Sequence, residues 1–343
     1  MNRLDTDLFS HPETFSTEFT AGLQRILGQH SLGAFILACA NASGQAGLYQ
    51  ALGALLEAEY RDLRQDYLAG VEANGVAEDL QVFVRLLELG LENLPPTSTR
   101  TTGPWQLQFN AMRAFRPQRH AAQVPERLDI PFDPLDFHFN KPFMVKEQLW
   151  EGSGYGHILA AYYNKYPFAD YHLLWVPDRD RQLPQFLPRQ YHELIWQLCI
   201  DLNESLPGFA MGYNALGGFA SVNHLHFQSY LGEPLPITYG LWQHNDGQQD
   251  YPLSVYRFHQ PEEAWRLIQQ MHEMNQAYNL LYTDEAMYCI PRLRQGTYEQ
   301  PLWSPGFAWR EVCGDMVTVE AEDFDRLTAQ AIESELGKLK VVL

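Results

Sequence analysis

The spacing of apolar residues changes near residue 95, and this change most constrains what the chain can fold into. Before it, apolar residues recur at the spacing of amphipathic helices in three stretches. These stretches are 15–27, 48–67 and 82–89. After it, shorter stretches alternate apolar and polar residues, as strands do. The Pro/Ser/Thr-rich segment NLPPTSTRTTGP between the two parts predicts a linker. We therefore expect a helical region over residues 1–100 and a second domain over residues 101–343.

The second region mixes short strands with helices. Two strands joined by a turn around Pro167 are expected first, and helices are expected to begin at Pro188 and Pro261. The segment YNLLYTDEAMYCIPR predicts a hairpin that turns at Asp284. A further short strand is expected in FHFNKPF, over residues 137–143. Antiparallel strands in small groups with helices between them predict the α+β class.

Composition excludes several classes of function. Lys and Arg total 24 against 42 Asp and Glu, which gives a net charge of -18. Such an acidic surface repels phosphate backbones, so we expect no nucleic-acid partner. No apolar run is long enough to span a membrane, and the first residues have no signal-peptide pattern. The four cysteines are widely spread without a Cys-x-x-Cys pair, which predicts reduced, buried thiols in a cytoplasmic protein.

The segment NHLHFQ raises the question of chemistry. Alternate side chains of a strand face opposite ways, so His224, His226 and Gln228 would share one face. Leu225 and Phe227 would then share the other face and pack into the core. The residues alone leave three interpretations open: a solvated polar face, hydrogen-bonded structural histidines, or two metal ligands. A metal site would need a third ligand, and the sequence nominates none.

A glycine-containing loop precedes this segment. GYNALGGFAS contains Asn214, the adjacent Gly217 and Gly218, and Ser221. Adjacent glycines allow a loop backbone to come close to a ligand, and the amides of such a loop can hold phosphate oxygens. An ordinary tight turn is the alternative. A polar strand that follows such a loop favours an anion site.

The pattern Asn-x-x-Gly followed by Ser-x-x-His-x-His-x-Gln resembles the active-site segment of the histidine-triad superfamily. Gln228 stands where glutamine replaces the third histidine in the branch of galactose-1-phosphate uridylyltransferases, dinucleoside tetraphosphate phosphorylases and GDP-hexose phosphorylases. Six segments in the same order, over roughly residues 80–330, resemble the GDP-L-galactose and GDP-D-glucose phosphorylases. They are LQFNAMRAFRPQRH, PFDPLDFHFNKP, YYNKYPFADYHLLWVPD, GYNALGGFASVNHLHFQSYL, YNLLYTDEAMYCIPR and WREVCGDMVTVEAEDFD. The resemblance implies an antiparallel sheet of duplicated half-barrels.

The resemblance also implies an enzyme that cleaves a nucleoside diphosphate hexose, with GDP-hexose favoured. His226 would attack the α-phosphorus, forming a covalent nucleotidyl-histidine and releasing a sugar phosphate. Inorganic phosphate or a sugar phosphate would then accept the nucleotide. The backbone near His224 would fix the tautomer of His226, and Gln228 would donate a hydrogen bond to a phosphate oxygen.

Other positions match the family's nucleotide- and phosphate-binding residues. By this resemblance Asn164 would contact the ribose, and Asn214 and Ser221 would contact phosphate or orient the nucleophile. Lys141 and Arg113 would neutralise phosphate charge. A turn asparagine is the alternative for Asn164, and a solvated charge is the alternative for each cation.

The expected partners are a nucleotide sugar and phosphate, with a possible homodimer and with no cofactor, metal, nucleic acid or membrane. His138 is expected to be structural, whereas His172 matches a recurrent family histidine with no assigned step. Three alternatives stay open. They are a dinucleoside polyphosphate phosphorylase that uses the same His226, a nucleotide-binding protein without activity, and a metal-dependent hydrolase with His224 and His226 as ligands.

Overall fold

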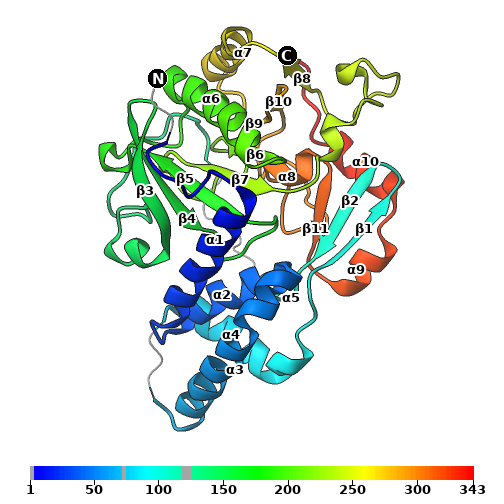
Figure 1. Ribbon diagram of the computed structural model, residues 1–343. Coiled ribbons are helices and arrows are strands. Elements are labelled where there is room, and N and C mark those ends of the chain that lie inside the picture. Colours follow the sequence, from blue (N-terminus) through cyan, green and yellow to red (C-terminus); the bar gives the residue numbers. More distant parts are fainter. Residues whose placement is uncertain (1–3, 72–74, 118–124) are drawn as a thin grey trace.

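The computed structural model describes residues 4–71, 75–117 and 125–343, and it contains two sheets with helices around them (Figure 1). The α+β class predicted from the sequence is confirmed. The helices are α1 (Pro12–Leu27), α2 (Leu32–Gly44), α3 (Ala46–Leu68), α4 (Ala77–Leu89), α5 (Ala111–Ala114), α6 (Arg189–Ser205), α7 (Pro261–Glu273), α8 (Trp309–Val312), α9 (Ala321–Arg326) and α10 (Ala329–Gly337). The strands are β1 (Ser98–Thr102), β2 (Trp105–Phe109), β3 (Gln148–Gly154), β4 (His157–Tyr163), β5 (Leu173–Pro177), β6 (Phe209–Asn214), β7 (Phe227–Leu231), β8 (Tyr256–Phe258), β9 (Tyr278–Tyr282), β10 (Met287–Pro291) and β11 (Asp315–Thr318).

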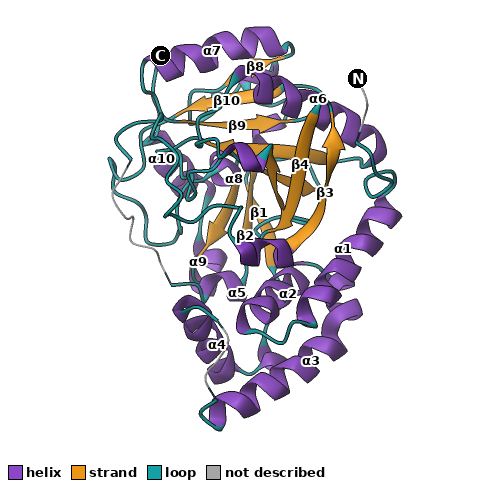
Figure 2. Ribbon diagram, turned by 90° about the vertical axis from the view of Figure 1, so that its left-hand side faces the viewer, coloured by secondary structure: helices purple, strands orange, loops and turns teal. Residues whose placement is uncertain are grey.

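The larger sheet has eight strands in the order β3-β4-β5-β7-β6-β9-β10-β8, and every neighbouring pair is antiparallel. The smaller sheet has the order β1-β2-β11, in which β11 runs parallel to β2. Helices α1–α5 gather at the end of the molecule away from α7 (Figure 2). Because the eight strands form one continuous sheet, the implied duplication into two half-barrels stays a prediction.

The larger sheet separates two apolar interiors. Alternate residues of its strands pack against α1, α2, α6 and α7 on what we call the helical face. Those residues include Leu159, Ala161, Tyr163, Trp175 and Phe227. The opposite surface, which we call the site face, carries the intervening residues and packs against α8, the smaller sheet and the loop before β3. Those residues include Ala160, Tyr162, Val176, Ala210 and Leu281.

The helical character of the N-terminal region is confirmed, but periodicity found three of its helices and missed α2. Most α2 side chains are buried, including Phe35, Leu37 and Ala40. A helix that is covered on all sides shows no apolar stripe, so it gives no periodic signal. Its burial places α2 at the centre of the helical region, between α1, α3 and α4.

The predicted linker is partly wrong. Residues 98–102 of NLPPTSTRTTGP form β1, which pairs antiparallel with β2. Its polar, largely exposed side chains resemble a loop in composition, because an edge strand needs no apolar run on its outer side. The helical region and the sheet also share one core, in which Phe19 lies 4.8 Å from Tyr163 between ring centroids. The division into residues 1–100 and 101–343 stays a prediction.

Most of the other predicted elements are present. The turn around Pro167 joins β4 to β5, helices α6 and α7 start beside Pro188 and at Pro261, and β9 and β10 turn through Asp284. The strand expected over residues 137–143 is wrong. That segment is a loop followed by a 3-10 helix from Pro142 to Glu147, because it folds against the site face instead of pairing with a strand. Within the described ranges, no helix has the length and apolar character needed to cross a membrane.

Candidate active site

A row of buried or half-buried polar side chains crosses the site face between two apolar clusters. One cluster contains Phe139 and Tyr162, and the other contains Trp309 and Tyr230. We call this row the polar strip. Its members are His172, Asn214, His226, Gln228 and Asn279. Buried polar groups are costly unless they are hydrogen-bonded, so the partners of each member show what the strip is built for.

His226 enters the strip just ahead of β7, which begins at Phe227. The expectation that His224 and His226 lie within the strand is therefore wrong, although Leu225 and Phe227 are buried on the helical face as predicted. The side-chain amide of Gln185 makes the main-chain hydrogen bonds that a neighbouring strand would otherwise make with His226. Its Oε1 accepts from the main-chain N–H of His226 at 2.8 Å, and its Nε2 donates to the carbonyl of the same residue at 3.1 Å.

The ring of His226 is held in one tautomer. Its Nδ1 lies 2.8 Å from the carbonyl oxygen of His224, and because a carbonyl only accepts, Nδ1 carries the proton. Burial lowers the pKa of His226 to about 4, so the ring is neutral at pH 7. Nε2 is then unprotonated, and it takes part in no hydrogen bond among the described residues. A buried imidazole with one spare lone pair has the form of a nucleophile.

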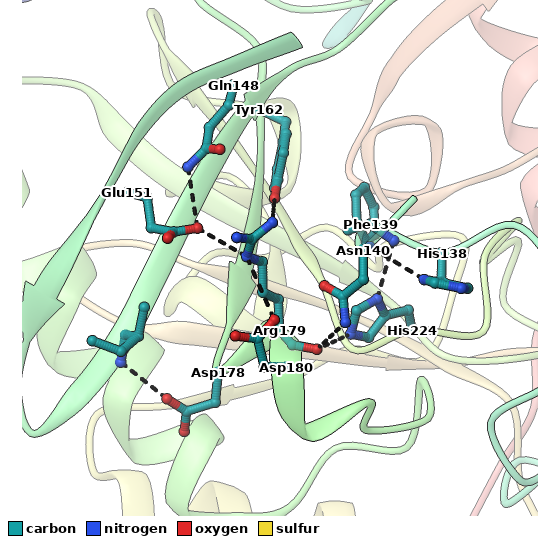
Figure 3. A network of polar contacts seen from close by, with 11 residues as sticks. His138, Phe139, Asn140, Gln148, Glu151, Tyr162, Asp178, Arg179, Asp180 and His224 are labelled. Carbon is teal, nitrogen blue, oxygen red and sulfur yellow. Dashed lines mark hydrogen bonds and ion pairs between the residues drawn. The ribbon is translucent and has the colours of Figure 1, made fainter. Parts of the chain in front are cut away.

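His224 uses both of its ring nitrogens (Figure 3). Nδ1 accepts from the main-chain N–H of Phe139 at 3.2 Å, and Nε2 donates to the carbonyl of Arg179 at 3.1 Å. Burial, with a smaller effect from the neighbouring His226, lowers the pKa of His224 to about 4. Arg179 is itself held by Glu151 at 2.8 Å and by the hydroxyl of Tyr162 at 3.2 Å. His224 therefore ties the loop before β3 to the end of β5 and has no lone pair left for chemistry.

Phe139 forms an aromatic wall beside the two histidines. Its ring centroid lies 5.3 Å from that of His226 and 5.6 Å from that of His224. It also stacks on Tyr162 at 5.6 Å with an interplanar angle of 29°. The neighbouring His138 accepts from the main-chain N–H of Asn140 at 3.2 Å, which is the structural role expected for it. The sequence signalled a strand here and gave no sign of this wall.

Gln228 has its carbonyl oxygen fixed by two donors. Oε1 accepts from Nε2 of His172 at 3.1 Å and from the indole Nε1 of Trp309 at 3.0 Å. His172 can donate through Nε2 because its Nδ1 accepts from the main-chain N–H of Phe168 at 3.4 Å. Burial is the main cause that lowers the pKa of His172 to about 3, so the ring is neutral at pH 7. With the oxygen held, the amide nitrogen of Gln228 is directed away from both donors.

Two guanidinium groups flank this end of the strip. Arg113 lies 4.6 Å over the ring of Phe168, and its Nη1 donates to the carbonyl of Tyr166 at 2.9 Å. Burial lowers the pKa of Arg113 to about 10, which leaves it charged at pH 7. Arg310 is paired with Asp315 at 2.6 Å. Both guanidinium charges lower the pKa of His172 further, which shows that their field reaches the strip.

Asn214 is held in the same way as Gln228. Its Oδ1 accepts from Nδ2 of Asn279 at 2.6 Å and from the main-chain N–H of Trp309 at 2.8 Å. Its own carbonyl accepts from Nε2 of Gln185 at 2.9 Å. The side-chain nitrogen of Asn214 is therefore turned away from both of these donors, as in Gln228.

The glycine loop forms a tight turn in this structure. Gly217 has a positive φ of 79°, which glycine adopts at no cost. The N–H of Gly218 donates to the carbonyl of Ala215 at 2.8 Å, and the N–H of Phe219 donates to Oε1 of Gln295 at 2.8 Å. These bonds occupy two amides of the loop that the sequence suggested for phosphate. The phosphate-binding role of Gly217 and Gly218 stays a prediction.

The other sequence-predicted residues are divided between the strip and the surface. Asn164 lies beside the strip, with its Nδ2 3.2 Å from Nε2 and 3.5 Å from Nδ1 of His172, and with its Oδ1 accepting from the N–H of Tyr166 at 3.0 Å. Ser221 is exposed, and the ammonium of Lys141 donates to the carbonyl of Pro134 at 3.0 Å. The structure thus brings Arg113 and Asn164 toward His172. Of the basic residues that trail Arg113 in the resemblance, Arg116 pairs with Glu78 at 2.9 Å, and those at 119 and 120 lie outside the described residues.

The metal-ligand interpretation of the histidine pair gains no support. No group of three or more His, Cys, Asp or Glu in residues 4–71, 75–117 and 125–343 is placed to hold a metal ion. Both nitrogens of His224 are already hydrogen-bonded within the protein. All four cysteines are buried and unpaired with one another, as expected.

Comparison with known proteins places the histidine pair in a family. Residues 104–230 match the family model described as GDPGP1-like, N-terminal domain. This segment of the chain is therefore similar to that family. The resemblance drawn from the sequence is therefore confirmed. The matched segment contains His224, His226 and Gln228, whereas Asn279 and Trp309 of the same site lie beyond it.

The proteins that are similar to this chain in sequence carry consistent names. The chain is 37% identical to human GDP-D-glucose phosphorylase 1 over 139 residues, which are 38% of this chain and 35% of the relative. It is 37% identical to GDP-L-galactose phosphorylase 1 of Arabidopsis thaliana over 75 residues, covering 22% of this chain and 16% of that one. The match thus spans about a third of the human protein's length. The solved structure of yeast Ap4A phosphorylase Apa2 with Ap4A matches at a TM-score of 0.48 and 14% identity, over 78% of this chain and 99% of that one.

Proposed function

We propose that this protein is a nucleotidyltransferase that cleaves a nucleoside diphosphate hexose, with GDP-hexose favoured, through a covalent nucleotidyl-His226. Phosphate, or a sugar phosphate, accepts the nucleotide. The observation that carries the proposal is the state of His226, whose Nδ1 proton is held by a carbonyl and whose Nε2 is unprotonated and unbonded within the described residues. The names of the relatives, GDP-D-glucose and GDP-L-galactose phosphorylase, support this class of substrate.

Both chemical steps follow from that tautomer. In the first, Nε2 of His226 forms a bond to the α-phosphorus as the bond from that phosphorus to the bridging oxygen breaks, and hexose 1-phosphate leaves. The ring becomes cationic while its Nδ1 proton stays against the carbonyl of His224, which stabilises the positive charge. In the second, an oxygen of phosphate attacks the same phosphorus, and the N–P bond breaks to release the nucleoside diphosphate. Splitting one displacement into two lowers each barrier.

The surroundings of His226 suit phosphoryl charge. The amide nitrogen of Gln228 is directed away from its two fixed donors and can donate to a non-bridging phosphate oxygen. The guanidinium group of Arg113 stands on the same side, as does that of Arg310, whose charge is paired with Asp315. Phe139, stacked on Tyr162 beside His226, offers an aromatic surface for a nucleobase. The proposal includes the ribose contact of Asn164, the phosphate or nucleophile contacts of Asn214 and Ser221, and the phosphate contact of Lys141. It also includes a homodimer and a cytoplasmic location.

A substrate panel tests the proposed function. GDP-glucose, GDP-mannose, UDP-galactose and Ap4A are each incubated with the protein and phosphate, and the products are separated by ion-exchange chromatography. We expect GDP and a hexose 1-phosphate from a GDP-hexose, with no GMP released when phosphate is saturating. Omitting phosphate should stop turnover after the first equivalent.

Other outcomes of the panel would contradict the proposal. Faster turnover of Ap4A than of every nucleotide sugar would instead indicate a dinucleoside polyphosphate phosphorylase. Tight nucleotide binding without any turnover would indicate a binding protein. Activity that is lost with a chelator and restored by one divalent metal would indicate a metal-dependent hydrolase.

A further inference from the structure

We propose that Trp309 is a positioning residue, which aims the side-chain nitrogens of Gln228 and Asn214 at the phosphate groups of the nucleotide. The proposal rests on the proposed function, and it adds a residue that lies outside residues 104–230, the segment that matches the family model. Trp309 is fully buried, so it acts through the two amides and makes no contact with substrate.

One residue donates to both amides. The indole Nε1 of Trp309 donates to Oε1 of Gln228 at 3.0 Å, and its main-chain N–H donates to Oδ1 of Asn214 at 2.8 Å. An amide side chain carries its acceptor and its donors on opposite branches, so holding the oxygen directs the nitrogen outward. Trp309 thereby sets the direction of two NH₂ groups that stand on neighbouring parts of the polar strip.

A second donor prevents either amide from flipping. His172 shares the oxygen of Gln228 at 3.1 Å, and Asn279 shares the oxygen of Asn214 at 2.6 Å. A flipped amide would place its NH₂ group against two N–H donors and would lose two hydrogen bonds in a buried setting. Each amide therefore has one orientation before a nucleotide binds, which is how preorganised donors stabilise charge in a transition state.

The indole is fixed by the backbone beneath it. It lies on Gly212 of β6, and a Cβ added at that glycine would overlap the ring. Gly212 is the register partner of Gln228, so the ring that covers this glycine is within reach of the glutamine. The ring of Tyr230 stacks on the indole as well, with centroids 5.8 Å apart and planes at 25°. The Nε1 atom cannot leave Gln228 without moving this packing.

Trp242 provides a matched control. It is also buried, it belongs to the same apolar cluster, and its indole donates to the carbonyl of Pro236 at 2.6 Å. It stacks on Trp105 and contacts no member of the polar strip in the described hydrogen bonds and ring contacts. Trp309→Phe and Trp242→Phe therefore remove the same group from similar surroundings, and only the first removes it from the strip.

The experiment measures transfer and nucleotide binding in wild type, Trp309→Phe and Trp242→Phe. We expect Trp309→Phe to lower kcat by about 10- to 100-fold with KM changed by less than about threefold, and to raise the Kd for GMP by about three- to tenfold. Trp242→Phe should stay within about twofold of wild type in all three. Gly212→Ala, which displaces the ring and keeps its N–H, should follow Trp309→Phe if the protein remains folded in circular dichroism.

Coupling separates positioning from a general structural role. If Trp309 acts through Gln228, adding Trp309→Phe to Gln228→Ala should cost less than about twofold more in kcat. Equal losses in both backgrounds would overturn the proposal, as would a kcat and a Kd for GMP within twofold of wild type. A wild-type protein that binds GMP but forms no nucleotidyl-histidine would refute the proposed function. It would leave the positioning role open to test, because the Kd of Trp309→Phe for GMP could still be compared with that of wild type. A wild type that neither binds nor transfers would overturn both.

Discussion

His192 and His226 are two buried, neutral histidines on opposite faces of the same sheet. Burial lowers the pKa of each to about 4. His192, in α6, uses both nitrogens: Nδ1 bonds to the hydroxyl of Tyr282 at 2.9 Å and Nε2 donates to the carbonyl of Pro261 at 3.0 Å. His226 uses Nδ1 alone. A low pKa therefore does not distinguish the two histidines, whereas the hydrogen bonds of their ring nitrogens do.

The same contrast separates the two faces of β7 and the residues before it. Leu225 and Phe227 point to the helical face, where apolar packing is complete. His226 and Gln228 point to the site face. There Nδ1 of His226 and Oε1 of Gln228 are hydrogen-bonded within the protein, while Nε2 of each side chain is directed away from those partners. If the proposed function holds, the helical face serves stability and the site face serves binding, so substitutions on the two faces should affect different quantities.

The largest effect is expected from His226→Asn. The asparagine nitrogen can still donate to the carbonyl of His224, but no atom replaces Nε2. Phosphorolysis of a GDP-hexose should fall by at least about 10⁴-fold, because the covalent route is lost. The free energy of unfolding, from urea denaturation, should stay within about 1 kcal/mol of wild type. A variant that keeps more than a few per cent of the wild-type kcat would contradict the assignment.

His192→Asn makes the matching change on the helical face. It leaves the hydroxyl of Tyr282 or the carbonyl of Pro261 without its partner, and an unsatisfied buried group costs about 1–3 kcal/mol. We expect the free energy of unfolding to fall by that amount while kcat per folded molecule stays within about twofold. Loss of activity with unchanged stability would show that the two faces are not separate in function.

Gln185→Glu tests a residue that supports the main chain of His226 and Asn214, so it should affect both activity and stability. A carboxylate can accept from the N–H of His226 but cannot donate to the carbonyls of His226 and Asn214. We expect kcat to fall about tenfold and stability to fall by about 1–3 kcal/mol. Gln276→Glu is the control, since the Gln276 amide donates to the carbonyls of Ala277 and Arg292. It should lose stability and keep kcat, and equal kcat values in the two variants would contradict the role of Gln185.

The smallest effect concerns pH. Burial sets the pKa of His192 and of His226 to about 4, below the value of about 6.5 for an unfolded histidine. Between those values the unfolded chain binds more protons, so the free energy of unfolding falls as pH falls from 6.5 toward 4. Each histidine should contribute on the order of 1 kcal/mol between pH 7 and pH 5. Urea denaturation should show a flatter pH dependence in His192→Asn and in His226→Asn than in wild type. Identical slopes would show that these rings titrate normally.

Local periodicity predicted the elements that have one exposed side. Helices α1, α3, α4, α6 and α7 each have a polar face, and the hairpin of β9 and β10 has a polar turn. Helix α2 was missed because it is buried on nearly all sides, and β1 was taken for a linker because its side chains are polar. In both cases the tertiary environment, which the local pattern does not contain, decides the outcome.

The candidate site was predictable where a local motif or the family resemblance marked its residues. The alternation in NHLHFQ and the family resemblance nominated His226, His224 and Gln228 together. Gln185 and Trp309 were missed because they reach the strip across 41 and 81 residues of sequence. His172 was noted without a role, since its hydrogen bond to Gln228 exists only after β5 and β7 have paired.

The central claim is that His226 forms a covalent bond to the nucleotide. GDP-glucose labelled at the α-phosphate is mixed with the protein without phosphate, and the quenched protein is digested and mapped by mass spectrometry. We expect one equivalent of acid-labile, alkali-stable GMP on His226, its release as GDP when phosphate is added, and no label in His226→Asn. Label on another residue, or turnover of GDP-glucose without any labelled protein, would contradict the account.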